Sequence, residues 1–371
     1  MKKKYSWFEP SVGNLNNKYL QQCLKENFPN EGNITYNFLD LISKKIGSKF
    51  AVGTTSGTTA IYLALKSLDI GHGDEVIIPN ITFIATANAV KMAGATPIIL
   101  DTNELDLNIN VNLIEDKITK KTKAIIPVHV SGKGADIIEI LKIAKKNKIY
   151  VIEDSAESLF SKFKGKYLGT YGELGCFSLA PNKILTTGQG GIITTNSKKL
   201  YLKLIRLKDQ GRTKRGNGGD DIHNYLGYNF KLTNIQASIG MMQMKNINKR
   251  ISRLKRNYSL YVKYLKNIKS IKIISFDINK GELPLWTCLV CNKRNDLVKF
   301  LEKFDIECRN FWLPINHQRP YKASLKTIKK DFKISSTIYK KVFWLPSSYN
   351  LKDKDIIYIS KKIISYFAKY E

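Results

Sequence analysis

Several features that define large classes of proteins are missing from this 371-residue chain. Its cysteines number only five, an odd and scattered set, which argues against a disulfide-built extracellular scaffold and for a reducing compartment. No apolar run reaches the ~18 residues that a membrane span requires. The start, Met1-Lys-Lys-Lys-Tyr5, has no apolar stretch behind it, so no signal peptide is expected. These absences predict a cytoplasmic protein without a membrane segment.

Acidic residues and arginine are scarce relative to lysine. The chain has 31 Asp and Glu against 61 Lys and Arg, a formal net charge of +30, and only nine of those basic residues are Arg. Clustered basic residues bind nucleic-acid phosphates, but here they are spread out, with one denser stretch at 245–266. No helix-turn-helix, zinc or aromatic RNA-reading pattern accompanies them. We therefore favour a solvated basic surface over a nucleic-acid site, and we expect that surface to attract an anionic small substrate.

Patterns that ligate metals are also sparse. The chain has four histidines, and its C-x-x-C spacing, Cys288 and Cys291, lies in a strand-like segment. Side chains three positions apart on a strand face opposite sides, and no second pair completes a tetrahedral site. We expect no metal site.

Short, almost wholly apolar runs alternate with helix-length segments between residues 35 and 200. The predicted strands are at 50–52, 75–78, 96–100, 123–128, 148–152, 176–179 and 191–195, and the predicted helices at 36–46, 58–68, 85–92 and 137–146. Apolar strands of this kind are typical of a parallel sheet buried on both faces by helices. The sequence therefore predicts an α/β fold with a mostly parallel central sheet.

The pattern changes after residue 240. A long basic helix is predicted at 237–266, followed by strands at 271–276 and 286–291 and by helices at 296–304 and 353–370. We expect a large α/β domain over residues 1–245 and a smaller C-terminal α+β domain over residues 246–371.

One lysine has surroundings unlike those of the others. Lys183 lies in a small, apolar, Gly-rich segment, and no acidic residue occurs from 174 to 196. A poorly hydrated amine loses its proton more readily and is then a nucleophile that can form a Schiff base. A buried lysine can equally be a structural ion-pair partner, so other segments must decide.

Three other segments supply that context. The turn Thr54-Thr-Ser-Gly-Thr-Thr-Ala60 precedes a predicted helix, where free N–H groups favour a phosphate, although a plain Ser or Thr N-cap has the same pattern. Asp154 follows a predicted buried strand, where it can keep a ring nitrogen protonated or cap the next helix. Phe83 lies in an intervening loop, and Lys183 follows Asp154 by 183 − 154 = 29 positions. Together these parts predict a pyridoxal phosphate (PLP) site.

Taken together, these segments resemble the sugar-nucleotide aminotransferases of the DegT/StrS type, which have the aspartate-aminotransferase fold, PLP fold type I. The resemblance covers nearly the whole chain and is carried by residues 50–60, 82–90, 126–132, 153–158, 177–191 and 227–236.

The resemblance implies a role for each matching residue. Lys183 would form the Schiff base with PLP and then move protons, and Asp154 would pair with the pyridinium nitrogen. The other residues that it places around the cofactor are Ser56, Gly57, Thr58, Phe83, Glu157, Ser178 and Asn229. Asn229 matches a family Asn that reaches the phosphate from the neighbouring subunit, so a homodimer with shared active sites is expected.

Two positions depart from the common family pattern. Glu157 stands where many members have His or Gln, and in this respect the sequence is most similar to the perosamine-synthase-like branch. Lys231 replaces a common Arg, which weakens any bidentate contact there. The segment 306–321 resembles the region that approaches the sugar nucleotide, so Arg309 and His317 are candidate substrate contacts. Phe311, Trp312 and His129 are interpreted as packing residues.

The resemblance thus predicts an aminotransferase of polysaccharide biosynthesis, such as that of O-antigen. It would convert a nucleotide-linked 4-keto-6-deoxyhexose to the 4-amino sugar, with L-glutamate as amino donor. The alternatives are a 3-keto-sugar aminotransferase, a PLP-dependent sugar dehydratase, or a non-catalytic nucleic-acid-binding regulator. Relatives that dehydrate carry His at the lysine position, so Lys183 argues against dehydration.

Overall fold

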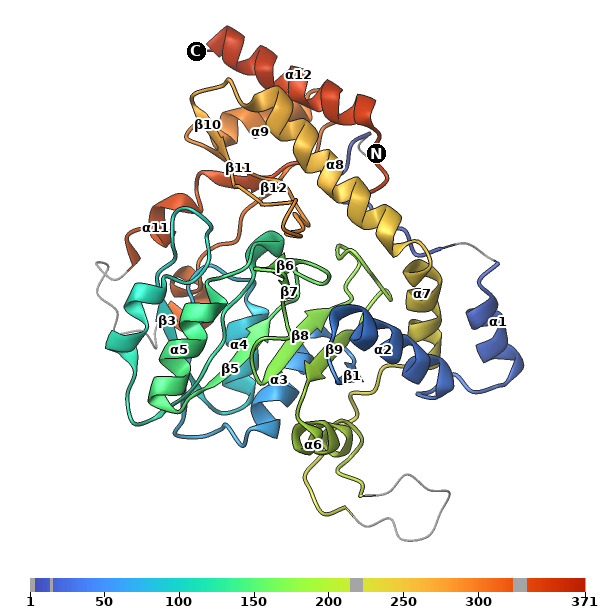
Figure 1. Cartoon of the computed structure of the whole chain (residues 1–371). Helices are drawn as coiled ribbons and strands as arrows, with labels where there is room; N and C mark the ends of the chain where they lie inside the picture. The colour runs from blue at the N-terminus through green and yellow to red at the C-terminus, as the bar shows by residue number, and fades with distance from the viewer. Residues whose placement is uncertain (1–3, 14–15, 214–222, 323–331, 371) are drawn as a thin grey trace.

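Seven strands form the central sheet, in the spatial order β1-β9-β8-β5-β4-β2-β3. The computed structural model describes residues 4–13, 16–213, 223–322 and 332–370 (Figure 1). The strands are β1 Phe50–Thr54, β2 Glu75–Pro79, β3 Thr96–Leu100, β4 Thr122–Ile125, β5 Tyr150–Asp154, β8 Leu174–Ser178 and β9 Gly191–Thr195. The strands β3, β2, β4, β5 and β8 run parallel, and β9 is antiparallel to both β8 and β1. The predicted mostly parallel sheet is confirmed.

Helices cover both faces of this sheet. On β2, Ile77 packs into a cluster with residues of α5 (Ile137–Asn147), whereas Val76 and Ile78 pack into another with residues of α3 (Gly57–Ser67) and α4 (Ala85–Met92). All three side chains are fully buried. Burial on both faces explains why the strands are almost continuously apolar.

The remaining helices before residue 245 lie around this core. They are α1 Lys18–Lys25, α2 Asn33–Ile46, α6 Lys198–Lys208 and α7 Asn234–Met244. A small hairpin, β6 Lys162–Phe163 and β7 Lys166–Tyr167, stands apart from the central sheet. Short 3-10 turns occur at η1 Val111–Leu113, η2 Glu115–Lys117 and η3 Val130–Gly132.

A second, antiparallel sheet lies in the C-terminal part, in the order β10-β11-β13-β12. Its strands are β10 Ile271–Ile273, β11 Cys288–Cys291, β12 Arg309–Asn310 and β13 Val342–Trp344. The helices α8 Ile247–Leu265 and α12 Asp353–Tyr370 lie side by side over this sheet, with α9 Arg294–Glu302 (Figure 1). The shorter elements are η4 Ile315–His317, α10 Arg319–Lys322 and α11 Ser335–Ile338.

Contacts cross the proposed boundary between residues 245 and 246. At the N-terminus, Tyr5 forms a parallel bridge with Ile306. In the other direction, Asp101 accepts the backbone N–H groups of Ile334 and Ser335, each at 2.8 Å. The proposed division into two domains coincides with the change of sheet, and these contacts show that Tyr5 lies beside the C-terminal part and residues 334–335 beside the segment after β3.

The predicted helix at 237–266 is wrong in one respect, because it is two helices. Asn246 has a non-helical backbone (φ −110°, ψ 11°) and separates α7 from α8. Its N–H donates to the carbonyl of Gln243 at 3.0 Å, and its own carbonyl accepts the N–H of Arg250 at 3.2 Å. Asparagine is a poor helix former, so a break here costs little. The predicted strands at 271–276 and 286–291 are likewise shorter, as β10 and β11.

The two cysteines of the C-x-x-C spacing face opposite sides of β11, as expected. Cys288 packs with the core cluster of Trp286 and Trp344, and Cys291 with the cluster of Leu289 beneath α12. Within the described ranges, no group of three or more His, Cys, Asp or Glu is placed to hold a metal ion. No described helix combines the length and apolarity needed to cross a bilayer.

Candidate active site

A cavity of about 540 Å³ opens at the C-terminal ends of the parallel strands. Its wall contains most of the predicted site residues, namely Ser56, Gly57, Thr58, Phe83, Asp154, Glu157, Ser178, Lys183 and Arg309. Asp154 ends β5, Ser178 ends β8, and Ser56 follows β1. This is the edge at which open α/β sheets bind ligands.

Lys183 reaches the cavity from the loop between β8 and β9. The residue is only 9% exposed, and its Nζ lies 3.4 Å from Glu157 Oε1. The same Nζ lies 4.8 Å from the centroid of the Trp286 ring. The amine is therefore enclosed by an indole and one carboxyl group, and that carboxyl comes from 26 positions earlier in the chain.

Asp154 is the carboxyl group at the buried end of β5. Burial raises its pKa, and two hydrogen bonds oppose that rise. The Thr86 hydroxyl donates to Oδ2 at 2.7 Å, and the Ala156 N–H donates to Oδ1 at 3.1 Å. A buried carboxyl group with no full positive charge bonded to it is suited to a cationic ring nitrogen.

Glu157 connects Lys183 to the small sheet. Its Oε2 accepts the N–H of Ser131 at 2.8 Å, and burial raises the pKa of the carboxyl group while Lys183 opposes the rise. Ser131 has a left-handed backbone (φ 55°), and its Oγ accepts the indole N–H of Trp344 at 2.9 Å. Ser131 thus forms hydrogen bonds both with Glu157 in the cavity and with Trp344 of β13.

The first turn of α3 contains donors without partners. Ser56 caps the helix through a capping box with Thr59, so the N-cap interpretation is correct for its hydroxyl. The N–H groups of Gly57 and Thr58 form no hydrogen bond with any described residue. At Gly57 an added Cβ would lie 3.0 Å from Ser178 Cβ. The turn therefore keeps two free donors and a tight wall, which fit a phosphate group.

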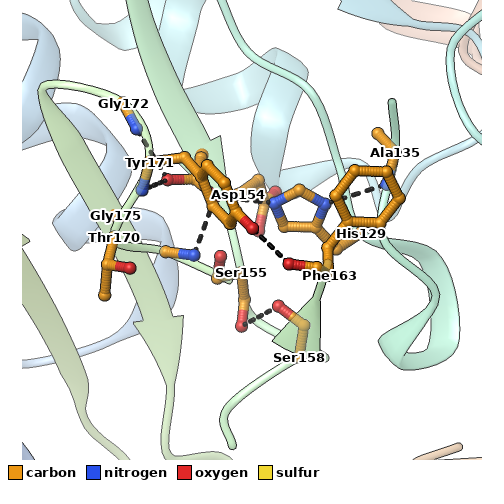
Figure 2. A network of polar contacts seen from close by, with 12 residues as sticks. His129, Ala135, Asp154, Ser155, Ser158, Phe163, Thr170, Tyr171, Gly172 and Gly175 are labelled. Atoms are coloured by element: carbon orange, nitrogen blue, oxygen red, sulfur yellow. Dashed lines mark hydrogen bonds and ion pairs between the residues drawn. The ribbon is translucent and has the colours of Figure 1, made fainter. Parts of the chain in front are cut away.

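Behind Asp154 lies a buried polar network (Figure 2). His129 and Glu153 are fully buried, and the His129 Nδ1 accepts the N–H of Ala135 at 3.1 Å. The ring proton is therefore on Nε2, which donates to Glu153 Oε2 at 3.0 Å. The other acceptor positions of Glu153 take backbone N–H groups of Gly169, Tyr171 and Gly172. His129 is buried as expected, but its role is polar as well as steric.

This network holds the end of β5 in place. The backbone N–H of His129 donates to the Asp154 carbonyl at 3.1 Å, and the Asp154 N–H donates to the Pro127 carbonyl at 2.9 Å. The position of the Asp154 carboxyl group thus depends on a segment that Glu153 and His129 fasten from behind.

The other predicted residues lie in different surroundings. Phe83 is 53% exposed at the cavity wall. Asn229 is exposed and bridges Asp209 outside the cavity wall. His317 lies in η4, where its ring packs edge-on against Tyr339 at 5.6 Å, and it does not line this cavity.

Sequence reasoning missed several residues of the site. Trp7 and Trp286 line the cavity, Thr86 bonds Asp154, and Ser131 bonds Glu157. Trp312, interpreted as a packing residue, lines the cavity as well as packing on Trp344. Thr86 follows Phe83 by one helical turn and could have been found from that spacing. The tryptophans and Ser131 carry no local signal.

Comparison with known proteins agrees with this geometry. The model of the DegT/DnrJ/EryC1/StrS aminotransferase family matches residues 10–364. A GDP-perosamine synthase of Escherichia coli O157:H7 is 33% identical over 366 residues, covering 97% of this chain and 98% of that protein. A UDP-N-acetyl-3-dehydro-alpha-D-glucosamine 3-aminotransferase of Acidithiobacillus ferrooxidans is 43% identical over 194 residues, 52% of this chain and 51% of its own.

Solved structures agree on the fold. Helicobacter pylori PseC, an aminotransferase involved in the biosynthesis of pseudoaminic acid, superposes with a TM-score of 0.92 at 23% identity, covering 99% of this chain and 100% of its own. The chain belongs to the DegT/DnrJ/EryC1/StrS aminotransferase family, has PLP fold type I, and is an aminotransferase that depends on PLP. The free N–H groups of α3, the buried Asp154 and the enclosed Lys183 fit this cofactor.

Proposed function

We propose that the protein transfers the amino group of L-glutamate to a nucleotide-linked 4-keto-6-deoxyhexose and forms the 4-amino sugar, as in polysaccharide biosynthesis. The observation that carries this proposal is the similarity to GDP-perosamine synthases over nearly the full length of both chains. A cavity of about 540 Å³ falls within the ~300–1,000 Å³ typical of small-molecule sites.

Within the site, each residue has a distinct task. Bound PLP supplies the carbonyl that exchanges the amino group and a ring that takes up negative charge. Lys183 would attach the cofactor and carry protons at Nζ, which lies 3.4 Å from Glu157 Oε1. Asp154 would hold the proton of the ring nitrogen, Phe83 would pack on the ring, and the turn at 56–58 with Ser178 would bind the phosphate.

We also propose a homodimer with shared sites. Asn229 is exposed, and the segment before it exposes two large apolar side chains, with Leu226 84% and Tyr225 43% accessible. An exposed apolar segment beside a polar one is suited to a protein interface. In this proposal Asn229 reaches the phosphate bound by the neighbouring subunit. None of the five cysteines, which all lie within the described ranges, is in a disulfide, and this suits a cytoplasmic location.

A second candidate is amination at the 3-position. It is favoured by the 43% identity to a 3-aminotransferase, although that match covers half of each chain. Retention of Lys183 disfavours a dehydratase. A regulator is the weakest alternative: one relative, 30% identical over 327 residues, is named a pleiotropic regulatory protein, yet Lys183, Asp154 and Glu157 of this chain line one cavity.

A substrate panel tests the ring position. The holoenzyme is incubated with L-glutamate and GDP-, UDP- or dTDP-linked 4-keto-6-deoxy sugars, or with a UDP-linked 3-keto sugar, and products are identified by mass spectrometry. We expect amination of a 4-keto sugar. Turnover of only the 3-keto sugar contradicts the proposal and favours the second candidate.

The role of Lys183 is tested by substitution. Lys183→Ala is expected to lose the absorbance of the covalently attached cofactor and to lower turnover by at least about 10²-fold, because general acid–base catalysis contributes that much or more. Lys146→Ala, an exposed lysine of α5 paired with Glu115, is the matched control and should keep both properties. Full turnover by Lys183→Ala would sink the assignment.

A further inference from the structure

All four tryptophans of the chain gather at the cavity. The ring centroids of Trp7 lie 5.4 Å from Trp286 and 6.2 Å from Trp344. Trp286 and Trp344 are 4.9 Å apart, and Trp312 lies 5.1 Å from Trp344. Residues from the N-terminus, the loop before β11, the segment after β12, and β13 thus form one aromatic cluster. Of the four tryptophans, Trp286 contacts Lys183, whose Nζ lies 4.8 Å from the centroid of its ring.

Arg309 is the cation of this cluster. Its guanidinium carbon lies 4.6 Å from the Trp7 ring centroid and 5.7 Å from that of Trp344. The residue is half-buried and lines the cavity. Its guanidinium forms no hydrogen bond or ion pair with any described residue. Contact with indole rings leaves the N–H edge of a guanidinium available for a planar anion.

Two other partly buried arginines bond to backbone carbonyls. Arg250 donates to the carbonyls of Ile184 and Ser11, at 3.1 and 2.7 Å. Arg294 donates to the Tyr339 carbonyl at 2.6 Å. Arg309 lines the cavity without an acceptor on any described residue, so its N–H donors are available to an anionic ligand there.

Trp7 reaches the cavity because the N-terminal segment extends the small sheet. Tyr5 donates to the Asp305 carbonyl at 3.0 Å and accepts the N–H of Glu307 at 2.9 Å. The Trp7 carbonyl accepts the N–H of Ser347 at 2.9 Å, beyond β13. These bonds place the Trp7 indole against Arg309, which lies on β12. The N-terminal segment is therefore built into the wall of the active site.

We propose that Arg309, positioned by Trp7, binds the anionic oxygens of the substrate, and that the N-terminal segment thereby helps to set substrate affinity. The inference rests on the proposed function, which brings two such anions to the cavity: the carboxylate of the amino donor and the phosphates of the nucleotide. Both present paired oxygens that match a guanidinium edge. Trp7 acts through Arg309 and is a positioning residue.

Two binding measurements on the holoenzyme distinguish the anions. In the donor arm, L-glutamate is titrated without sugar and the cofactor absorbance is followed. In the nucleotide arm, GDP, UDP and dTDP are titrated and tryptophan fluorescence is followed, since every tryptophan lies in the cluster. Arg309→Gln is expected to weaken binding about tenfold or more in at least one arm, because a hydrogen bond between two charged groups is lost. The arm that weakens identifies the anion.

Further variants separate positioning from a general loss of structure. Trp7→Ala should weaken the same arm as Arg309→Gln, whereas Trp7→Phe keeps a ring beside the guanidinium and should bind nearly as the wild type. Arg309→Lys keeps the charge without the planar edge and should lie between wild type and Arg309→Gln. Arg256→Gln removes an equal charge from an exposed arginine of α8 that pairs with Asp353, and should change neither arm.

The outcomes separate the two proposals. Changes within about twofold in both arms for Arg309→Gln and Arg309→Lys, with cofactor content unchanged, overturn the anion site. Weakening by Arg309→Gln but not by Trp7→Ala overturns the positioning role of Trp7. A wild-type protein that binds nucleotides through Arg309 but whose cofactor absorbance does not respond to glutamate contradicts the proposed donor and leaves the anion site supported.

Discussion

At the scale of single residues, the site depends on how carboxyl groups are placed around one amine. Glu157 lies 3.4 Å from Lys183 Nζ, and its second oxygen takes the Ser131 N–H. Asp154 is held by Thr86 and Ala156. Burial raises the pKa of both carboxyl groups, so each is poised to gain a positive partner. In the cofactor-free protein, burying these carboxyl groups in their charged form therefore has a cost in folding free energy.

This cost predicts a pH-dependent effect of Glu157→Gln on stability. Burial raises the folded-state pKa of Glu157, so its contribution to stability is present below the usual Glu pKa and is lost as pH rises through the raised value. The amide is neutral and can still accept the Ser131 N–H. In the cofactor-free protein we expect a higher Tm for Glu157→Gln than for wild type at pH 8, and a gap that narrows toward pH 5.

Thermal unfolding of both cofactor-free proteins from pH 5 to 8 provides the measurement. Glu139→Gln, at an exposed carboxyl of α5 paired with Lys142, is the matched control and should show no such trend. A Tm difference that is constant with pH, or a variant less stable than wild type at pH 8, contradicts the expectation.

Some of the site residues could be predicted from sequence. Lys183 was identifiable because its segment lacks acidic residues, and Asp154 because it follows an apolar strand. Both signals are local. Ser131 could not be identified from sequence, because its role comes from hydrogen bonds to Glu157 and Trp344, which are 26 and 213 positions away.

At the scale of elements, local sequence patterns predicted where many helices and strands lie, but they did not predict where one helix ends and the next begins. The predicted strands at 96–100 and 191–195 and the helices at 85–92 and 353–370 match the observed bounds. The break at Asn246 was missed because apolar periodicity continues across it. Because α7 packs against α1 and α2 whereas α8 packs against α12, the two helices have different neighbours, which local periodicity cannot reveal.

One buried ion pair ties two of these elements together and supports a stability prediction. Lys208, at the end of α6, contacts Glu31, just before α2, and both side chains are 1% exposed. Burial lowers the pKa of Lys208, and Glu31 opposes that shift. Lys208→Met leaves a buried carboxyl group without its cation and is expected to destabilise by about 3–5 kcal/mol.

A double substitution makes this test specific. Replacing both residues, Glu31→Met with Lys208→Met, removes both charges and should recover most of the lost stability. Urea unfolding of the two single variants and the double variant gives the coupling energy. A double variant as unstable as the sum of the single variants rules out the pair as the cause.

At the scale of the whole molecule, the proposed dimer yields the sharpest test. If Asn229 serves the neighbouring subunit, Lys183→Ala and Asn229→Ala damage opposite subunits of one site. Mixing the two inactive homodimers through reversible dissociation then creates hybrids with one intact site. With random pairing, half of the dimers are hybrids, so activity should recover to about a quarter of wild type.

The control for this experiment is a mixture that cannot complement. Lys183 and Asp154 line the same chain's cavity, so a hybrid of Lys183→Ala with Asp154→Asn has one defect in each of its two sites and should recover no activity. No recovery with Asn229→Ala would assign Asn229 to its own subunit's site. Recovery in the control mixture would contradict the assignment of Lys183 and Asp154 to the same chain's site.

The sequence by itself determined the alternation that builds a mostly parallel sheet, the positions of Lys183 and Asp154 at its edge, and the family to which they belong. These depend on neighbours within a few residues, where periodicity and turn chemistry act. Only the tertiary structure decided that Glu157 faces Lys183 and that Trp7 meets Arg309, 309 − 7 = 302 positions away. Such contacts arise when separate segments pack into one core, and no local pattern encodes which segments will meet.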